Sequence, residues 1–149
     1  MVIDIPFCRD HLLLAVFDGH GGSYVSEYAE SHLLALLLDS NAWHKYLSNR
    51  SPTLLCEALV DTFLTLDLHI QNDLGAKAYK CGCTGVLAVI SPTHIICANV
   101  GDSRCVLGTA STTIPMSYDH KPNSPEETLR IIAAGGVWNT LDRCRSVFH

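Results

Sequence analysis

Hydrophobic residues along this chain occur in two patterns, short continuous runs and longer stripes with helical spacing. Residues 12–17 form an unbroken apolar run that ends in the letters DGHGG, which predicts a buried strand leaving the core through a glycine-rich turn. Apolar residues then recur every three to four positions over 23–39, which predicts an amphipathic helix. The same spacing over 51–70, opened by a serine and a proline, predicts a second long helix.

The second half of the chain is richer in strand-forming runs. Residues 84–90, 94–100 and 104–107 each read as a strand, and the near-continuous apolarity of the first two predicts that both of their faces are covered. Ser124 and Glu127 have the spacing of a capping box, which predicts a short helix that ends at the following glycine pair. These elements predict a layered arrangement of helices and strands.

Composition and charge narrow the class of protein. The chain has 149 residues without an internal repeat or a flexible linker, so we expect one domain with a real core. A net charge of -5 without a basic stripe argues against a nucleic-acid partner, and no apolar run is long enough for a membrane helix. The sequence shows no export signal, and its seven cysteines lack CxxC spacing, so we expect an intracellular protein, cytoplasmic or nuclear. Its oligomeric state is not predicted.

The turn after the first strand contains the first candidate site. Asp18 offers a carboxylate, a neighbouring carbonyl could point outward, and His20 could move a proton. Such an oxygen-rich set suits Mg²⁺ or Mn²⁺. An Asp-Gly pair is also ordinary turn material, and for an isolated pair the plain turn is the stronger interpretation.

Two further polar segments have ordinary interpretations of their own. The segment from Asn99 to Arg104 places Asp102 at a tight turn, which alone reads as a plain hairpin with a solvated arginine. Residues 117–122 read as a loop leading into the third helix. Zinc has no support from HExxH or finger-type spacing, and no serine-hydrolase elbow or nucleotide-binding loop occurs.

Four segments, taken in order along the chain, favour a functional site at these turns over the plain-turn interpretation. The segments LLAVFDGHGG, GCTGVLAVI, ANVGDSR and SYDHKPNSPEETLRIIAAGG resemble the type 2C family of metal-dependent protein serine/threonine phosphatases. The resemblance covers about residues 12–136 and implies an α+β fold, a two-layer antiparallel β-sandwich flanked by α-helices. It implies that residues 1–149 are a partial phosphatase domain, truncated at both ends, with 137–149 as an unassigned tail.

The resemblance also implies roles for individual residues. It makes Asp18 a bridging ligand of two Mg²⁺ or Mn²⁺ ions, with the Gly19 carbonyl as a further ligand of one of them. It makes His20 the catalytic acid that protonates the leaving alcohol, and it makes Asp102 a ligand of a further metal. The implied function is hydrolysis of phosphoserine and phosphothreonine in a phosphoprotein substrate by metal-activated water.

Parts of the family pattern are missing from this sequence. The family has an arginine and a Glu-Asp pair before the DGH strand and two metal-binding aspartates after the AGG helix, and residues 1–11 and 137–149 do not match them. Asp142 is not assigned such a role. These departures motivate an alternative function: a catalytically incompetent pseudophosphatase fragment that acts as a binding or regulatory module. A third and less favoured function is a metal-binding regulatory domain without phosphate chemistry.

Overall fold

The computed structural model describes residues 2–5, 8 and 10–136, and the tail at 137–149, with Asp142, lies outside the described residues. Helices and antiparallel strands are mixed along the chain, so the expected α+β class is confirmed. In chain order the elements are β1 (Val2–Asp4), β2 (Leu12–Val16), β3 (Gly19–His20), α1 (Tyr24–Asp39), α2 (Asn41–Asn49), α3 (Pro52–Leu74), the 3-10 turn η1 (Gly75–Lys77), β4 (Gly82–Cys83), β5 (Gly85–Ile90), β6 (Ile95–Val100), β7 (Val106–Gly108), β8 (Thr113–Pro115) and α4 (Pro125–Ala133).

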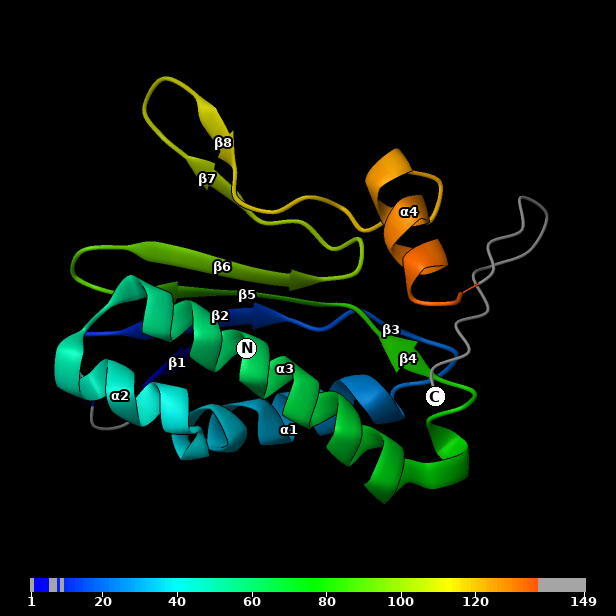
Figure 1. Ribbon diagram of the computed structural model, residues 1–149. Helices are drawn as coiled ribbons and strands as arrows, with labels where there is room; N and C mark the ends of the chain where they lie inside the picture. The colour runs from blue at the N-terminus through cyan, green and yellow to red at the C-terminus, as the bar shows by residue number, and fades with distance from the viewer. Residues whose placement is uncertain (1, 6–7, 9, 137–149) are drawn as a thin grey trace.

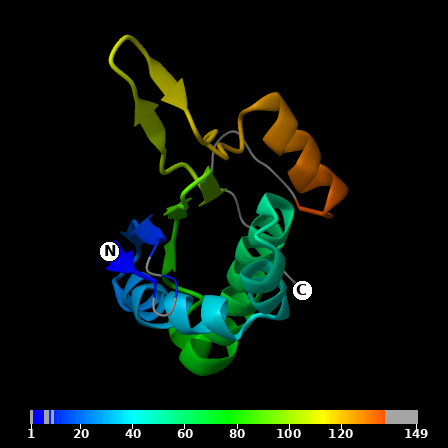
Figure 2. The same ribbon diagram turned by 90° about the vertical axis from the view of Figure 1, so that its left-hand side faces the viewer.

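The described elements lie in three levels (Figure 1). A four-stranded antiparallel sheet with the order β1-β2-β5-β6 occupies the middle, and α1, α2 and α3 cover one of its faces. The hairpin of β7 and β8 and the helix α4 lie on the opposite side, as the turned view also shows (Figure 2). The described residues thus form a helical layer, the four-stranded sheet and a smaller two-stranded sheet, which correspond to part of the expected layered fold.

The core lies between the sheet and the helices because strand side chains alternate in direction. On β2, Leu13 and Ala15 point to the helices and are buried, whereas Val16 is largely exposed. Leu33 of α1 and Leu59 of α3 meet them from the helix side, and neither is more than 1% exposed. The stripes predicted from the sequence therefore form this core.

Strand β5 is buried along almost its whole length, as its continuous apolarity predicted. Strand β6 differs, because it is the edge strand in the described part of the sheet and most of its residues are only half buried. No helix among the described residues has the length and apolar character needed to cross a membrane.

The capping box predicted before α4 does not form. The Ser124 hydroxyl donates to the Lys121 carbonyl at 2.9 Å, and the Glu127 carboxylate is paired with Arg130. Both side chains therefore have other partners. The end of the helix is as predicted, because Gly135 adopts φ +78° and the Gly136 N–H donates to the Ile131 carbonyl.

Candidate functional site

Asp18 lies two residues after the end of β2, where the chain leaves the sheet. Its carbonyl accepts a hydrogen bond from the Thr84 N–H at 2.9 Å, which fixes the backbone at this point. Asp18 is solvent-exposed. The strand therefore presents a carboxylate at the end of the sheet, as the apolar run followed by Asp-Gly predicted.

The next two residues form β3, which pairs with β4 in a short antiparallel ladder. Gly19 pairs with Cys83 and His20 with Gly82. The ring of His20 lies close to the backbone of β4, because a Cβ added to Gly82 would be 2.7 Å from its Nε2 atom. The absence of a side chain at Gly82 thus leaves room for this imidazole.

The glycine that follows His20 has a conformation that other residues rarely adopt. Gly21 has φ +72°, and a Cβ added there would lie 2.1 Å from the Lys80 carbonyl oxygen. The thiol of Cys81 also donates to the Gly21 carbonyl at 3.2 Å. The DGHGG loop is therefore held against the segment before β4, and close approach of two backbones requires glycine at this position.

Asp102 lies two residues after the end of β6 and is also solvent-exposed. The plain hairpin considered for this turn is wrong, because β6 pairs with β5 whereas β7 pairs with β8. The turn lies beside the first residue pair of β5 and β6, and the hydroxyl of Thr84 is hydrogen-bonded to that of Ser103. Since Thr84 also holds the backbone of Asp18, both aspartates lie at the same end of the sheet.

A loop after β8 holds the Asp102 turn in place. The Nδ2 atom of Asn99 donates to the carbonyls of Gly101 and Tyr118, at 3.1 and 3.0 Å. The His120 N–H donates to the same Gly101 carbonyl at 3.0 Å. Residues 99–104 and 117–121, far apart in the sequence, thus form one hydrogen-bonded unit.

Within this unit Asp119 binds two cations. Its carboxylate accepts two hydrogen bonds of 2.9 Å from the Arg104 guanidinium, and Lys121 Nζ lies 3.2 Å away. The Arg104 and Lys121 hydrogen bonds lower the pKa of Asp119 to about 2. Arg104 is thus an exposed ion-pair partner in a loop rather than a strand residue, because β7 begins only at Val106. Sequence spacing gave no signal for this pair, since the partners are brought together by the fold.

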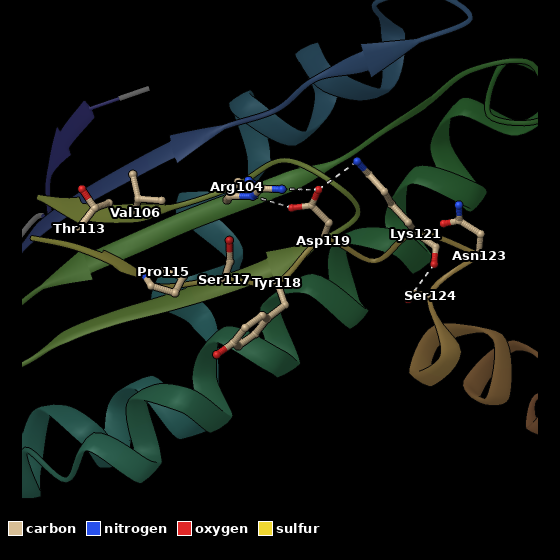
Figure 3. Close-up of a pocket in the computed structure, with 10 residues that line it drawn as sticks. All are labelled: Arg104, Val106, Thr113, Pro115, Ser117, Tyr118, Asp119, Lys121, Asn123 and Ser124. Atoms are coloured by element: carbon tan, nitrogen blue, oxygen red, sulfur yellow. Dashed lines mark hydrogen bonds and ion pairs between the residues drawn. The ribbon is translucent and has the colours of Figure 1, made fainter.

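These ionic side chains line a cavity of about 540 Å³ between the β7–β8 hairpin and the start of α4. Figure 3 shows Arg104 and Lys121 pointing toward Asp119, with Tyr118 directed away from it. Asp18, Gly19 and His20 are not among the lining residues. The cavity and the DGH segment are therefore separate features of the surface.

The donors at the Asp18 end suit a hard divalent cation, because they are carboxylate and carbonyl oxygens on exposed residues. Burial, and after it the charge of Asp18, raises the pKa of the nearby Cys83 thiol. Within the described residues, no group of three clustered acidic, histidine or cysteine side chains contains Asp18.

Comparison with known proteins gives the context for this arrangement. Residues 9–148 match the family model described as protein phosphatase 2C. The chain is 37% identical over 131 residues to protein phosphatase 2C homolog 2 of Saccharomyces cerevisiae, and 42% identical over 122 residues to protein phosphatase 2C homolog 2 of Schizosaccharomyces pombe. These matches cover 86% and 81% of this chain.

A solved structure gives the same result for the fold. The crystal structure of serine-threonine phosphatase 2C from Toxoplasma gondii matches with a TM-score of 0.76 and 28% identity, over 89% of this chain and 47% of that one. The chain spans only 27% and 31% of the lengths of the two yeast proteins. Sequence, segment order and fold agree, and the chain therefore belongs to the protein phosphatase 2C family.

Proposed function

We propose that this chain is the central part of a metal-dependent protein serine/threonine phosphatase domain that acts on phosphoproteins inside the cell. The main support is that one end of the sheet presents Asp18, Gly19 and His20 beside the turn that contains Asp102. The reducing intracellular location is supported by the six described cysteines, all of which are free.

In this proposal the Asp18 carboxylate and the Gly19 carbonyl hold Mg²⁺ or Mn²⁺, and Asp102 contributes to a further, weaker site. A pair of such ions, when bound, supplies an acidified water and offsets negative charge on the phosphoryl oxygens. The protein positions these donors through the Thr84 N–H, which holds the Asp18 carbonyl, and through the Thr84 hydroxyl, which contacts Ser103.

His20 acts as the proton donor in the same proposal. Its imidazole belongs to an exposed residue, and its Nε2 and Cε1 atoms lie over the backbone of Gly82. A side chain placed this way can deliver a proton to the oxygen of the departing serine or threonine. The short β3–β4 ladder limits its movement, so the donor is positioned before the substrate arrives.

A second candidate function is a binding module of the same family without catalysis. It is supported by the incomplete donor set, since the described residues place no cluster of three ligand side chains around Asp18. In this case the chain would hold a phosphoprotein or a regulator without hydrolysing it.

A phosphopeptide hydrolysis assay in Mn²⁺ separates these two functions. Asp18→Ala should lower the Mn²⁺-dependent rate of the 149-residue chain to the metal-free background, because it removes the carboxylate that would hold the metal. Asp61→Ala is the matched control, since Asp61 is an exposed acid on α3 and not a proposed metal ligand. If the unmodified chain and Asp18→Ala show the same background rate, this chain is not an enzyme by itself, and phosphopeptide binding then tests the second function.

A further inference from the structure

A second cluster of chemically reactive side chains lies at the other end of β2 from Asp18. The turn before the strand closes with a hydrogen bond of 2.8 Å from the His11 N–H to the Cys8 carbonyl. This turn gathers Cys8, Asp10 and His11, and one possible ligand atom from each lies within 4.8 Å of the other two. Cys8 and His11 are only 2% and 3% exposed. Thiol, carboxylate and imidazole are thus assembled in the sequence order C-x-D-H.

The distances within this cluster are close to those of a metal site. His11 Nδ1 lies 3.2 Å from Cys8 Sγ and 2.7 Å from Asp10 Oδ1, and the sulfur lies 3.7 Å from the same oxygen. The ligands of a tetrahedral zinc ion are about 3.4–3.6 Å apart, given zinc-ligand bonds of about 2.0–2.3 Å. The imidazole-carboxylate separation must therefore open by about 0.7 Å. The Asp10 side chain is 54% exposed and has room to make that movement.

Helix α2 and the residue that follows it supply partners that orient two of these ligands. The hydroxyl of Tyr46 is hydrogen-bonded to His11 Nε2. When a metal ion takes the place of the proton in the 2.7 Å contact between His11 Nδ1 and Asp10, that proton can move to Nε2 and be donated to Tyr46, which leaves the Nδ1 lone pair for the metal. Arg50 Nη1 donates to Cys8 Sγ at 3.1 Å, a contact that a thiolate accepts more strongly than a thiol. Both partners come from outside the turn, and they are placed as the outer hydrogen bonds of a metal site are placed.

We propose that Cys8, Asp10 and His11 bind one Zn²⁺ ion within the turn before β2, whose Cys8 and His11 are hydrogen-bonded to Arg50 and Tyr46. Thiolate and imidazole ligands select zinc over Mg²⁺ and Mn²⁺, so this ion differs in kind from the one proposed at Asp18. Binding releases the thiol proton, and the two anions of Cys8 and Asp10 then offset the two charges of zinc. The seven residue steps along β2 from His11 to Asp18 place the two sites about 20 Å apart. Three protein ligands leave the fourth position of the zinc to water, and zinc binding is independent of phosphatase activity.

The test uses the whole 149-residue chain, freed of metal with a chelator and kept reduced without an added thiol. Titration with Co²⁺ should give a thiolate-to-cobalt charge-transfer band at one equivalent, and Zn²⁺ should abolish it. Cys8→Ser should remove the band, and Asp10→Asn should weaken zinc binding by at least about tenfold. Cys56→Ser and Cys81→Ser are matched controls, because they remove thiols of α3 and of the segment before β4 and should keep the band.

Thermal unfolding gives a second readout that does not depend on cobalt. Zinc should raise the Tm of the unmodified chain and of Cys56→Ser, and it should leave the Tm of Asp10→Asn much less changed. Asp10 is half exposed, so its variant tests the site even if Cys8→Ser does not fold. The proposal is overturned if the unmodified chain binds no zinc, if Cys8→Ser keeps the full charge-transfer band, or if excess Mg²⁺ displaces the ion.

Discussion

Replacing Gly21 by alanine should be far more damaging than the added methyl group suggests. At φ +72° a residue with a Cβ is strained by about 1–3 kcal/mol. The new Cβ would also lie 2.1 Å from the Lys80 carbonyl oxygen, a backbone atom that cannot rotate away. Relieving such an overlap costs about 1–3 kcal/mol more. We therefore expect Gly21→Ala to lower the free energy of unfolding by about 2–6 kcal/mol, a large share of the stability of an ordinary domain.

Two other glycines separate the contributions to this loss. Gly75 has φ +50° with nothing within 4 Å of an added Cβ, so Gly75→Ala carries the backbone cost alone, about 1–3 kcal/mol. An added Cβ at Gly108 also meets nothing within 4 Å, and φ there is not in the left-handed region, so Gly108→Ala should be neutral within about 0.5 kcal/mol.

Urea denaturation followed by circular dichroism measures all three variants against the unmodified chain. The expected order of destabilisation is Gly21→Ala, then Gly75→Ala, then Gly108→Ala. If Gly21→Ala is as stable as Gly108→Ala, the close packing of the DGHGG loop against Lys80 is refuted.

The remaining predictions concern the ion pairs and the core. Because Arg104 and Lys121 lower the pKa of Asp119 from 3.8 to about 2, its ion pairs stabilise the fold above pH 3.8 and lose this effect as the pH falls through about 2. The urea midpoint of Asp119→Asn should thus lie below that of the unmodified chain at neutral pH, and a gap that persists below pH 2 would contradict this cause. Leu33→Ala should cost about 2–5 kcal/mol, since Leu33 is fully buried, whereas Leu64→Ala should cost under about 0.5 kcal/mol in the same assay because Leu64 is 62% exposed. Equal losses in the two leucine variants would mean that the helices do not pack on the sheet as described.

The elements that the sequence predicted well are those with a strong periodic signal. The stripes over 23–39 and 51–70 became α1 and α3, and the apolar runs became β2, β5 and β6. Helix α2 was not predicted because its nine residues contain only a few buried positions, among them Trp43 and Tyr46. Strands β1 and β8 were also not predicted, because three residues are too few for an alternating pattern to be detected.

The local polar contacts were harder to predict for a different reason. Ser124 and Glu127 have the spacing of a capping box, yet both bond elsewhere, because spacing does not decide between competing hydrogen-bond partners. The turn at Asp102 read as a hairpin, but strand pairing is decided by the whole sheet, and β7 pairs with β8.

The sequence by itself determined the family and the candidate ligands, because DGHGG and GDSR are local signals and their order along the chain is specific. Only the tertiary structure decided which distant groups meet. It placed Asp18 and Asp102 at one end of the sheet, and it brought the turn at Cys8 against Tyr46 of α2 and Arg50, the residue after that helix. The physical reason is that such meetings depend on strand register and helix packing, which bring together residues that are tens of positions apart along the chain.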